Sequence, residues 1–123
     1  MKKNYNIGVE ATMNVIGGKW KPIILCNLRQ GSLRTNQLLK KIPNISQKML
    51  IQQLRELERD NIVIRKIYHE VPPKVEYSIS DYGKSLSEVL DTLCSWGEHH
   101  VNKLKSEGED VELDCRNKHL QSN

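Results

Sequence analysis

The segment from residue 45 to residue 79 constrains the fold of this chain more than any other stretch. Leu50, Leu54 and Leu57 are spaced four and three residues apart, so they share one face if the segment is helical. Two stretches rich in β-branched residues follow, at residues 62–68 and 75–79. This order predicts an amphipathic helix that runs directly into a two-stranded β-hairpin.

Polar residues mark the ends of this helix and the turn of the hairpin. Ser46 is a favourable N-cap, and Asn61 belongs to a residue type that commonly ends a helix. Residues 69–74 join the two strands and contain two prolines, which stiffen the turn. The sequence therefore predicts a helix over about residues 47–60 and a hairpin with a rigid tip.

The face of the helix opposite the leucines is polar and basic. At 100° per residue, four side chains fall within about 40° of that opposite direction: Lys48, Gln52, Arg55 and Arg59. A helix with such a face, followed by a basic hairpin, is typical of a winged helix-turn-helix, in which the helix enters the major groove of DNA. The sequence therefore favours a DNA-binding function.

The basic charge of the chain is concentrated on the same region. The net charge is +4, but residues 19–74 alone contain twelve Lys and Arg against four Asp and Glu. Residues 75–123 contain five Lys and Arg against ten Asp and Glu. A solvated surface explains scattered charge, whereas this segregation indicates a polyanionic partner such as double-stranded DNA.

Helical periodicity and turn residues define the rest of the fold. The expected elements are helices over about residues 9–16, 19–29, 36–41 and 81–104 and a short strand over residues 32–34. Thr35 and Ser80 are the expected N-caps of the last two of these helices. In the second helix, the side chains expected to face the core are Trp20, Ile23, Ile24 and Leu28. The predicted class is α+β and mostly helical, a winged helix-turn-helix domain with added N- and C-terminal dimerisation helices.

The last helix carries more apolar surface than one small core can cover. With about 24 residues it would be roughly 36 Å long at its rise per residue, and its apolar stripe runs from Tyr82 to Val101. Surplus apolar surface on a long helix favours a partner helix. We therefore expect a homodimer whose interface consists of Val9, Met13, Ile16, Leu86, Val89, Leu90, Leu93, Trp96 and Val101.

The length of 123 residues fits a single domain. We expect this domain to span residues 8–104 and to be followed by a polar, flexible tail over residues 105–123. No apolar run approaches the roughly 18 residues that a membrane helix needs, and no apolar segment follows Lys2 and Lys3 as in a signal peptide. We therefore expect a cytoplasmic protein without a membrane partner.

The residue types that commonly bind metals or catalyse reactions form no recognisable site in the sequence. Cys26, Cys94 and Cys115 stand at no metal-ligand spacing, and His99 and His100 have no carboxylate or thiol partner at such a spacing. Cys26 and Cys94 fall in apolar helical stretches, where a buried, inert thiol is expected. No nucleophile–base pair or phosphate loop appears, so we expect neither an enzyme nor a cofactor.

The helix over residues 47–60 supplies the side chains that we expect in the DNA groove. Donors and acceptors in its N-terminal half can reach base edges, and the expected set is Ser46, Gln47, Lys48, Ile51, Gln52 and Arg55. Two alternatives concern single members: Ser46 acting only as a cap, and Arg55 pairing with Glu56 or Glu58. Further contacts, to the DNA backbone or the minor groove, are expected from Arg34, Thr35, Lys66, His69 and Lys74.

Four blocks of the sequence resemble the HxlR-type transcriptional regulators, a branch of the MarR-like winged-helix proteins. The blocks are VEATMNVIGGKWKPIIL (9–25), PNISQKMLIQQLRELERDNIVIRKIY (43–68), VPPKVEYSISDYGKSL (71–86) and CSWG (94–97). The resemblance covers about residues 8–104 and implies a homodimeric bacterial regulator that binds an operator near the genes it controls. Many members carry a Cys-Pro pair before the first helix, and in some of them that Cys is a redox or electrophile sensor. Ile7 and Gly8 stand at those positions here.

Two classes of function are compatible with these patterns. The first is a sequence-specific transcriptional regulator, in our interpretation a repressor, that acts as a homodimer on an inverted-repeat operator. The second is a winged-helix module in which the same helix binds another protein. The charge distribution and the polar helix face favour the first. The sequence identifies neither the operator and its genes nor a small-molecule effector, which would be a further partner.

Overall fold

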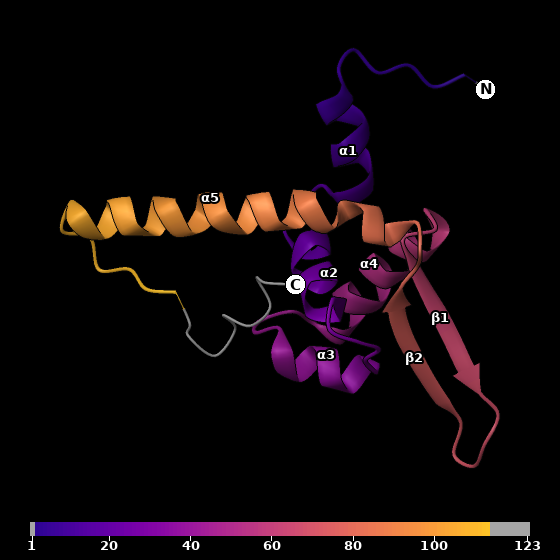
Figure 1. Cartoon of the computed structure of the whole chain (residues 1–123). Helices are drawn as coiled ribbons and strands as arrows, with labels where there is room; N and C mark the ends of the chain where they lie inside the picture. The colour runs from indigo at the N-terminus through magenta and orange to yellow at the C-terminus, as the bar shows by residue number, and fades with distance from the viewer. Residues whose placement is uncertain (1, 114–123) are drawn as a thin grey trace. The chain divides into compact units, whose positions relative to one another are not determined.

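The computed structural model describes residues 2–113 and contains the expected order of helices and strands (Figure 1). The elements are α1 (Gly8–Ile16), α2 (Trp20–Leu28), α3 (Thr35–Lys41), α4 (Gln47–Arg59), β1 (Val63–Tyr68), β2 (Lys74–Ile79), a 3₁₀ turn η1 (Gly83–Leu86) and α5 (Ser87–Ser106). The chain forms two compact units, one that ends at Lys84 and one that begins at Ser85. The α+β, mostly helical class expected from the sequence is confirmed.

The first unit is built around α4, which contacts α2, α3 and β1. Leu50, Leu54 and Leu57 are fully buried, as their spacing predicts. The neighbouring helices add the buried apolar side chains Ile24, Leu25, Leu28, Leu38 and Ile42. The leucine face of α4 therefore forms part of the core, and its opposite face is left to solvent.

Both ends of α4 are fixed by local hydrogen bonds. At the start, the Ser46 hydroxyl oxygen accepts a hydrogen bond from the backbone N–H of Met49 at 3.0 Å, which confirms the predicted N-cap. At the end, Asn61 adopts a φ of 62°, in the left-handed region that terminates helices. The backbone N–H of Ile62 then reaches back to the carbonyl oxygen of Leu57 at 2.9 Å. Helix and hairpin thus meet at a defined angle.

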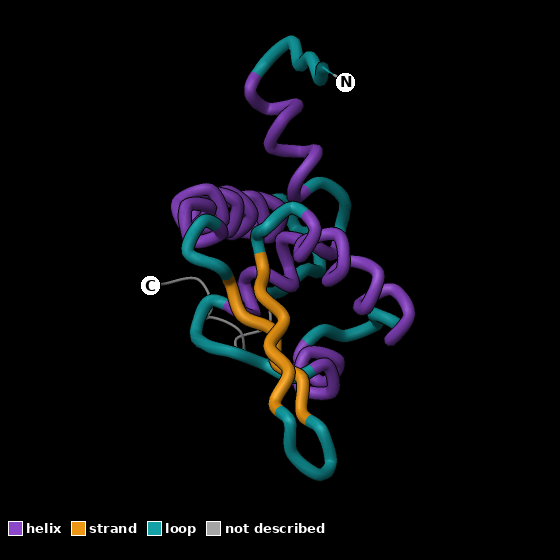
Figure 2. The backbone as a smooth tube through the Cα atoms, turned by 90° about the vertical axis from the view of Figure 1, so that its right-hand side faces the viewer, coloured by secondary structure: helices purple, strands orange, loops and turns teal. Residues whose placement is uncertain are grey.

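The hairpin is antiparallel and in register from Val63 opposite Ile79 to Tyr68 opposite Lys74. Its tip extends away from the helices of this unit (Figure 2). On the other side of β2, Leu33 and Tyr77 exchange two backbone hydrogen bonds at 3.0 and 2.9 Å, so the short strand expected near residue 33 is present as a single bridge. This bridge fixes β2 against the segment that precedes α3.

Two expected N-caps are wrong. Thr35 is the first residue of α3, and the cap is Arg34, whose backbone N–H donates to the Gln37 side chain at 2.8 Å. Ser80 instead holds the 3₁₀ turn, because its hydroxyl accepts from the backbone N–H of Gly83 at 2.8 Å. Gly83 lies so close to the carbonyl oxygen of Ile62 that a side chain at this position would collide with it, and α5 begins only at Ser87, later than expected.

Two expected core positions and the expected first residue of the apolar stripe on the last helix also differ. Ile23, on the outer side of α2, exposes 37% of its surface, because α2 carries apolar residues on more sides than its neighbours cover. Tyr82 exposes 63% and lies before α5 rather than on it, since the helix begins at Ser87. Trp20 is half-buried.

The second unit consists of α5 and the residues that follow it. The helix ends at Ser106, slightly beyond the expected end, and Gly108 takes a φ of 89° just after it. Leu90 is buried, whereas Val89, Leu93 and Trp96 expose 37%, 51% and 67% of their surface. The ring of Trp96 stacks on that of His100 with centroids 5.0 Å apart. None of the helices within residues 2–113 is both long and apolar enough to span a membrane.

Candidate nucleic-acid interface

The solvent face of α4 forms one continuous polar surface. Gln47, Lys48, Gln52 and Arg55 are exposed, and Ile51 is half-buried among them. An open groove follows this face and is lined by Gln47, Lys48, Ile51, Gln52, Arg55 and Glu56. Five of the six side chains predicted to enter a DNA groove are therefore brought together. We refer to this set, residues 47, 48, 51, 52 and 55, as the α4 surface.

Ser46, the sixth predicted member, is exposed at the N-terminal end of the α4 surface. Its hydroxyl oxygen already accepts the capping hydrogen bond from Met49, so the structural alternative for this residue is present. The hydroxyl proton remains a donor. Ser46 can therefore cap α4 and still donate to an acceptor in front of the helix.

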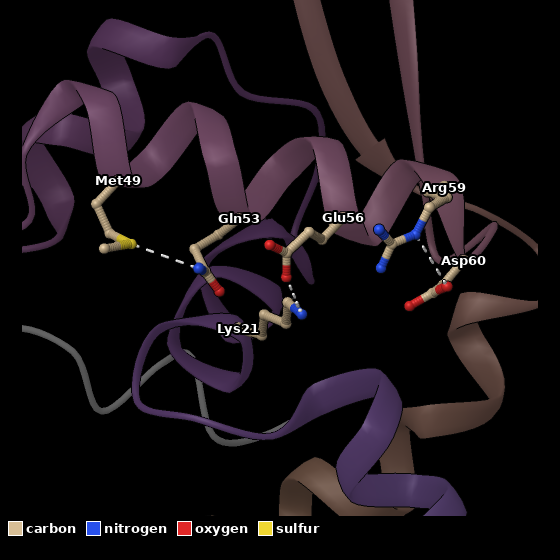
Figure 3. Close-up of polar contacts among 6 residues, drawn as sticks. All are labelled: Lys21, Met49, Gln53, Glu56, Arg59 and Asp60. Atoms are coloured by element: carbon tan, nitrogen blue, oxygen red, sulfur yellow. Dashed lines mark hydrogen bonds and ion pairs between the residues drawn. The ribbon is translucent and has the colours of Figure 1, made fainter.

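One flank of α4 is tied to α2 by an ion pair. Lys21 Nζ lies 2.6 Å from Glu56 Oε1, and Figure 3 shows the lysine reaching from α2 to the carboxylate on α4. Lys21 is buried although it is a lysine. Its hydrogen bond and its charge hold the pKa of Glu56 below the ordinary value, against a smaller opposing effect of burial. Lys21 belongs to the basic stretch of the sequence, but its charge is used in an ion pair inside the fold.

The Gln52 amide is not fully free to read DNA. After Lys21, a hydrogen bond from the Gln52 side chain also lowers the pKa of Glu56. The two residues are one helical turn apart, which is the spacing at which side chains on a helix interact. Gln52 can accept through its carbonyl oxygen in this arrangement, but bidentate pairing with adenine requires it to leave Glu56.

Arg55 is exposed to solvent. It pairs with neither Glu56 nor Glu58, the two carboxylates that its position in the sequence suggests as partners. Glu56 pairs with Lys21, and Glu58 lies 3.6 Å from the Nε of Arg65 on β1. Within residues 2–113, neither of these ion pairs involves Arg55. Its guanidinium group is therefore available at the edge of the α4 surface.

Arg65 is a candidate that the sequence analysis missed. It lies on β1 directly opposite Tyr77, on the side of the hairpin that faces α4. A second, smaller hollow is lined by Ile51, Arg55, Glu58, Arg65 and Tyr77. Alternation along β1 separates Arg65 from Lys66, but the sequence alone does not say which face meets α4. The burial of Tyr77 decides this in the structure.

The lysines of the hairpin lie on its opposite face. The Nζ atoms of Lys66 and Lys74 are 4.9 and 4.5 Å from the centroid of the Tyr68 ring, one from each strand. Such cation–π contacts restrict both side chains to one side of the hairpin. Lys74 also lies 3.6 Å from Glu76, which offsets part of its charge, and His69 is exposed at the tip.

The remaining predicted positions are at their expected places. Arg34 is exposed and Thr35 half-buried where α3 begins. The side chains of Cys26 and Cys94 are half-buried, less enclosed than their apolar surroundings in the sequence suggest. Cys115 lies outside the residues that the structure describes. No cluster of three or more His, Cys, Asp or Glu suited to a metal is found in the described part of the chain.

Comparisons with known proteins agree with this geometry. The family model described as HxlR-like helix-turn-helix matches residues 15–105. YtcD of Bacillus subtilis (strain 168), an uncharacterised HTH-type transcriptional regulator, is 59% identical over 103 residues, which cover 84% of this chain and 82% of that protein. Its crystal structure superposes with a TM-score of 0.75 and 56% identity over 78% of this chain and 98% of that one.

A second solved relative is the redox regulator HypR. Its oxidised form has a TM-score of 0.74 and 44% identity, and the match covers 85% of this chain and 100% of that chain. In its reduced form the TM-score is 0.77 at 46% identity, with 81% and 99% covered. The family is described as helix-turn-helix, YtcD as a transcriptional regulator and HypR as a redox regulator, so the relatives are regulators rather than enzymes. This chain therefore belongs to the HxlR-like helix-turn-helix family of transcriptional regulators.

Proposed function

We propose that this regulator is a repressor that binds an inverted-repeat operator as a homodimer and reads it with the α4 surface. The observation that carries the proposal is the α4 surface itself, where exposed amide and cationic side chains form a groove-lining set over a helix whose other face is core. Glutamine, lysine and arginine are the residue types that address base edges and phosphates in a major groove.

Exposed apolar side chains on α1 and α5 support a dimer. Val9 and Met13 expose 63% and 51% of their surface on α1, and Val89, Leu93 and Trp96 are exposed on α5. Large apolar side chains exposed together on one face of a helix favour a protein partner, and a second copy supplies a matching surface.

Two residues predicted for the dimer interface are buried in the single chain. Ile16 and Leu90 each expose only 2% of their surface, so they add nothing to the exposed apolar surface on which the dimer proposal rests. Their apolar spacing is the same as that of their exposed neighbours, which is why the sequence pattern does not separate them. Leu86 and Val101 are half-buried and remain at the margin of the proposed interface.

Dimerisation would give the DNA contact its geometry. Two α4 helices related by a two-fold axis read successive major grooves when they stand about 34 Å apart, and the target is then an inverted repeat. Repression follows if the bound dimer occupies promoter DNA, and a reporter gene fused to the protein's own upstream region would test it. Loss of the regulator should raise reporter expression, whereas a fall would indicate an activator.

A protein-docking role for the same helix is the competing function. It is tested by fluorescence anisotropy with labelled DNA from the region upstream of the gene, using wild type and Lys48→Ala. Lys48→Ala should weaken binding, whereas Lys103→Ala, which removes the same charge from α5, should not. If wild type fails to bind upstream or unrelated DNA at low salt, the docking role gains over the DNA-binding proposal.

A further inference from the structure

We propose that Arg65 and Arg55 hold one backbone phosphate in the hollow between α4 and β1, and that Glu58 is the internal counter-ion that Arg65 exchanges for it. This inference rests on the proposed DNA-binding function and adds a contact at the edge of the α4 surface, where Arg55 meets the hairpin residue Arg65. It also gives the base of the hairpin a role in addition to that of its tip.

The position of Arg65 is fixed by its surroundings. Arg65 pairs with Tyr77 across the hairpin, and Tyr77 exposes only 6% of its surface. On the other side, Tyr77 is secured by two backbone hydrogen bonds that it exchanges with Leu33, one donated by each residue. The Arg65 backbone is therefore held in the middle of a bonded ladder, so its guanidinium group starts from an ordered base rather than from a loop.

The size of the hollow suits a phosphate group better than a larger ligand. Its volume is about 240 Å³. Pockets for drug-sized molecules span roughly 300–1,000 Å³, and a water molecule occupies about 30 Å³ of the liquid. The hollow therefore has the volume of about eight waters, enough for one phosphate and part of its hydration shell.

The charges around the hollow favour an anion. Two arginines, Arg55 and Arg65, face one carboxylate, Glu58, which leaves one positive charge in excess. The Arg65–Glu58 pair is long, at 3.6 Å, and its side chains are 45% and 39% exposed. Exposed pairs of this kind contribute little to stability, so Arg65 can exchange its partner at low cost. The guanidinium fork binds phosphate oxygens in a bidentate manner.

The Tyr77 hydroxyl lies within the field of the same groups. Burial is the largest effect and raises the pKa of Tyr77, Glu58 raises it further, and Arg65 and Arg55 lower it. With a raised pKa, the hydroxyl stays protonated at neutral pH and remains a donor. Arg55, Glu58 and Arg65 therefore line the hollow together with a residue that carries a neutral donor.

Continuity with the α4 surface makes DNA the favoured source of the phosphate. Ile51 and Arg55 line both the groove along α4 and the hollow beside β1. A helix in the major groove is flanked by the two sugar-phosphate strands, and contacts to these strands fix the register of the protein. A phosphate at the edge of the α4 surface would lie where Arg55 and Arg65 meet.

The test compares Arg65→Gln and Glu58→Gln in DNA-binding titrations over a range of salt concentrations. Arg65→Gln should weaken binding to all sequences by roughly tenfold, the lower range for a lost charge-assisted hydrogen bond. It should also reduce the salt slope by about 0.9 for each half-site. Glu58→Gln should strengthen binding several-fold, because it removes the competitor of the phosphate and keeps the side-chain shape. Arg65→Lys should fall between wild type and Arg65→Gln.

The two Gln variants are expected to change the DNA affinity in opposite directions, and this distinguishes the proposal from a purely structural role of the Arg65–Glu58 pair. If Arg65→Gln and Glu58→Gln both weaken DNA binding and both lower the melting temperature, the pair is a structural link and the proposal is wrong. If wild type binds DNA and Arg65→Gln binds with the same affinity and slope, only the phosphate contact fails. If wild type binds no DNA at all, the proposed function itself fails.

Inorganic phosphate without DNA distinguishes a free anion from the DNA backbone. Millimolar phosphate is expected to give at most a small rise in the melting temperature of wild type, since an isolated phosphate lacks the neighbouring contacts of a duplex. A clear rise in wild type that Arg65→Gln abolishes, together with unchanged DNA binding of Arg65→Gln, would assign the hollow to a small anionic effector and overturn the DNA assignment.

Discussion

Single side chains on and around α4 divide into those used by the fold and those left for a partner. Lys21 and Lys48 belong to the same basic stretch of sequence, yet Lys21 is buried against Glu56 while Lys48 is exposed. Glu58 similarly takes Arg65 as its partner, and Arg55 stays open to solvent. The local charge that a DNA strand would meet is therefore smaller and more localised than the sequence suggests.

Gln52→Ala and Lys48→Ala are expected to affect DNA binding in different ways. If Gln52 reads a base, its loss costs roughly 1–3 kcal/mol and relaxes sequence preference at one position of each half-site. If Lys48 holds phosphate, its loss weakens all sequences about equally and lowers the salt slope. Binding titrations against operator variants measure both effects. Small, equal effects of the two substitutions on every DNA would show that α4 is not the reading element.

The Lys21–Glu56 pair is expected to make stability depend on pH. The pKa of Glu56 is lowered below its ordinary 4.5, so the pair stabilises the fold fully above that pH and loses this contribution as the pH falls through the lowered pKa. Lys21→Met removes the largest cause of the shift. Urea denaturation at several pH values should show wild type and Lys21→Met converging in free energy of unfolding as the pH is lowered.

The control for this experiment is Lys40→Met, at an exposed position of α3. Its difference from wild type should stay small and vary little with pH in the acidic range. A difference between wild type and Lys21→Met that is the same at neutral and at strongly acidic pH would contradict the assignment, because it would place the effect of Lys21 in packing rather than in the ion pair.

At the scale of helices and strands, the N-cap of α4 both sets where the helix begins and contributes to the stability of the fold. Ser46→Ala should lower the free energy of unfolding by about 1 kcal/mol, since the N–H of Met49 loses its acceptor. Chemical denaturation measures this. Ser95→Ala, at an exposed position within α5, is the matched control and should be neutral or slightly stabilising. Equal effects of the two would mean that the cap contributes nothing.

The elements with strong patterns were predictable from the sequence, and those set by close tertiary approach were not. Leucine spacing identified α4, and β-branched alternation identified the hairpin. The 3₁₀ turn before α5 brings Gly83 so close to Ile62 that any side chain there would collide, and no local pattern encodes this tertiary approach. The capping role of Gln37 at α3 was likewise hidden behind the more obvious Thr35.

The residues of the candidate site also fall into those that could be predicted from the sequence and those that could not. Helical geometry alone brought the α4 surface together, because its members follow from the position of the leucines. Arg65 could not be assigned, since a two-residue alternation gives two faces of a hairpin without saying which one meets α4. The burial of Lys21 was also invisible, because a lysine is usually exposed and its partner Glu56 is far along the chain.

For the whole molecule, the first question is its oligomeric state. Leu93→Glu should give a folded monomer, because Leu93 is half exposed on α5 and its substitution leaves the buried Leu90 in place. Sedimentation velocity at micromolar concentration measures the mass, and circular dichroism confirms folding. Ser95→Glu, on the opposite side of α5, should remain dimeric. Wild type that sediments as a monomer would contradict the proposed dimer.

A symmetric dimer that binds duplex DNA through cations on α4 and the hairpin should lose affinity steeply as the salt concentration rises. The most direct test is the affinity of wild type for its upstream DNA as a function of salt. With roughly 6–10 phosphate contacts, the affinity should fall about 10³–10⁵-fold between 50 and 200 mM salt. A nearly flat salt response, or equal affinity for DNA with and without an inverted repeat, would contradict it.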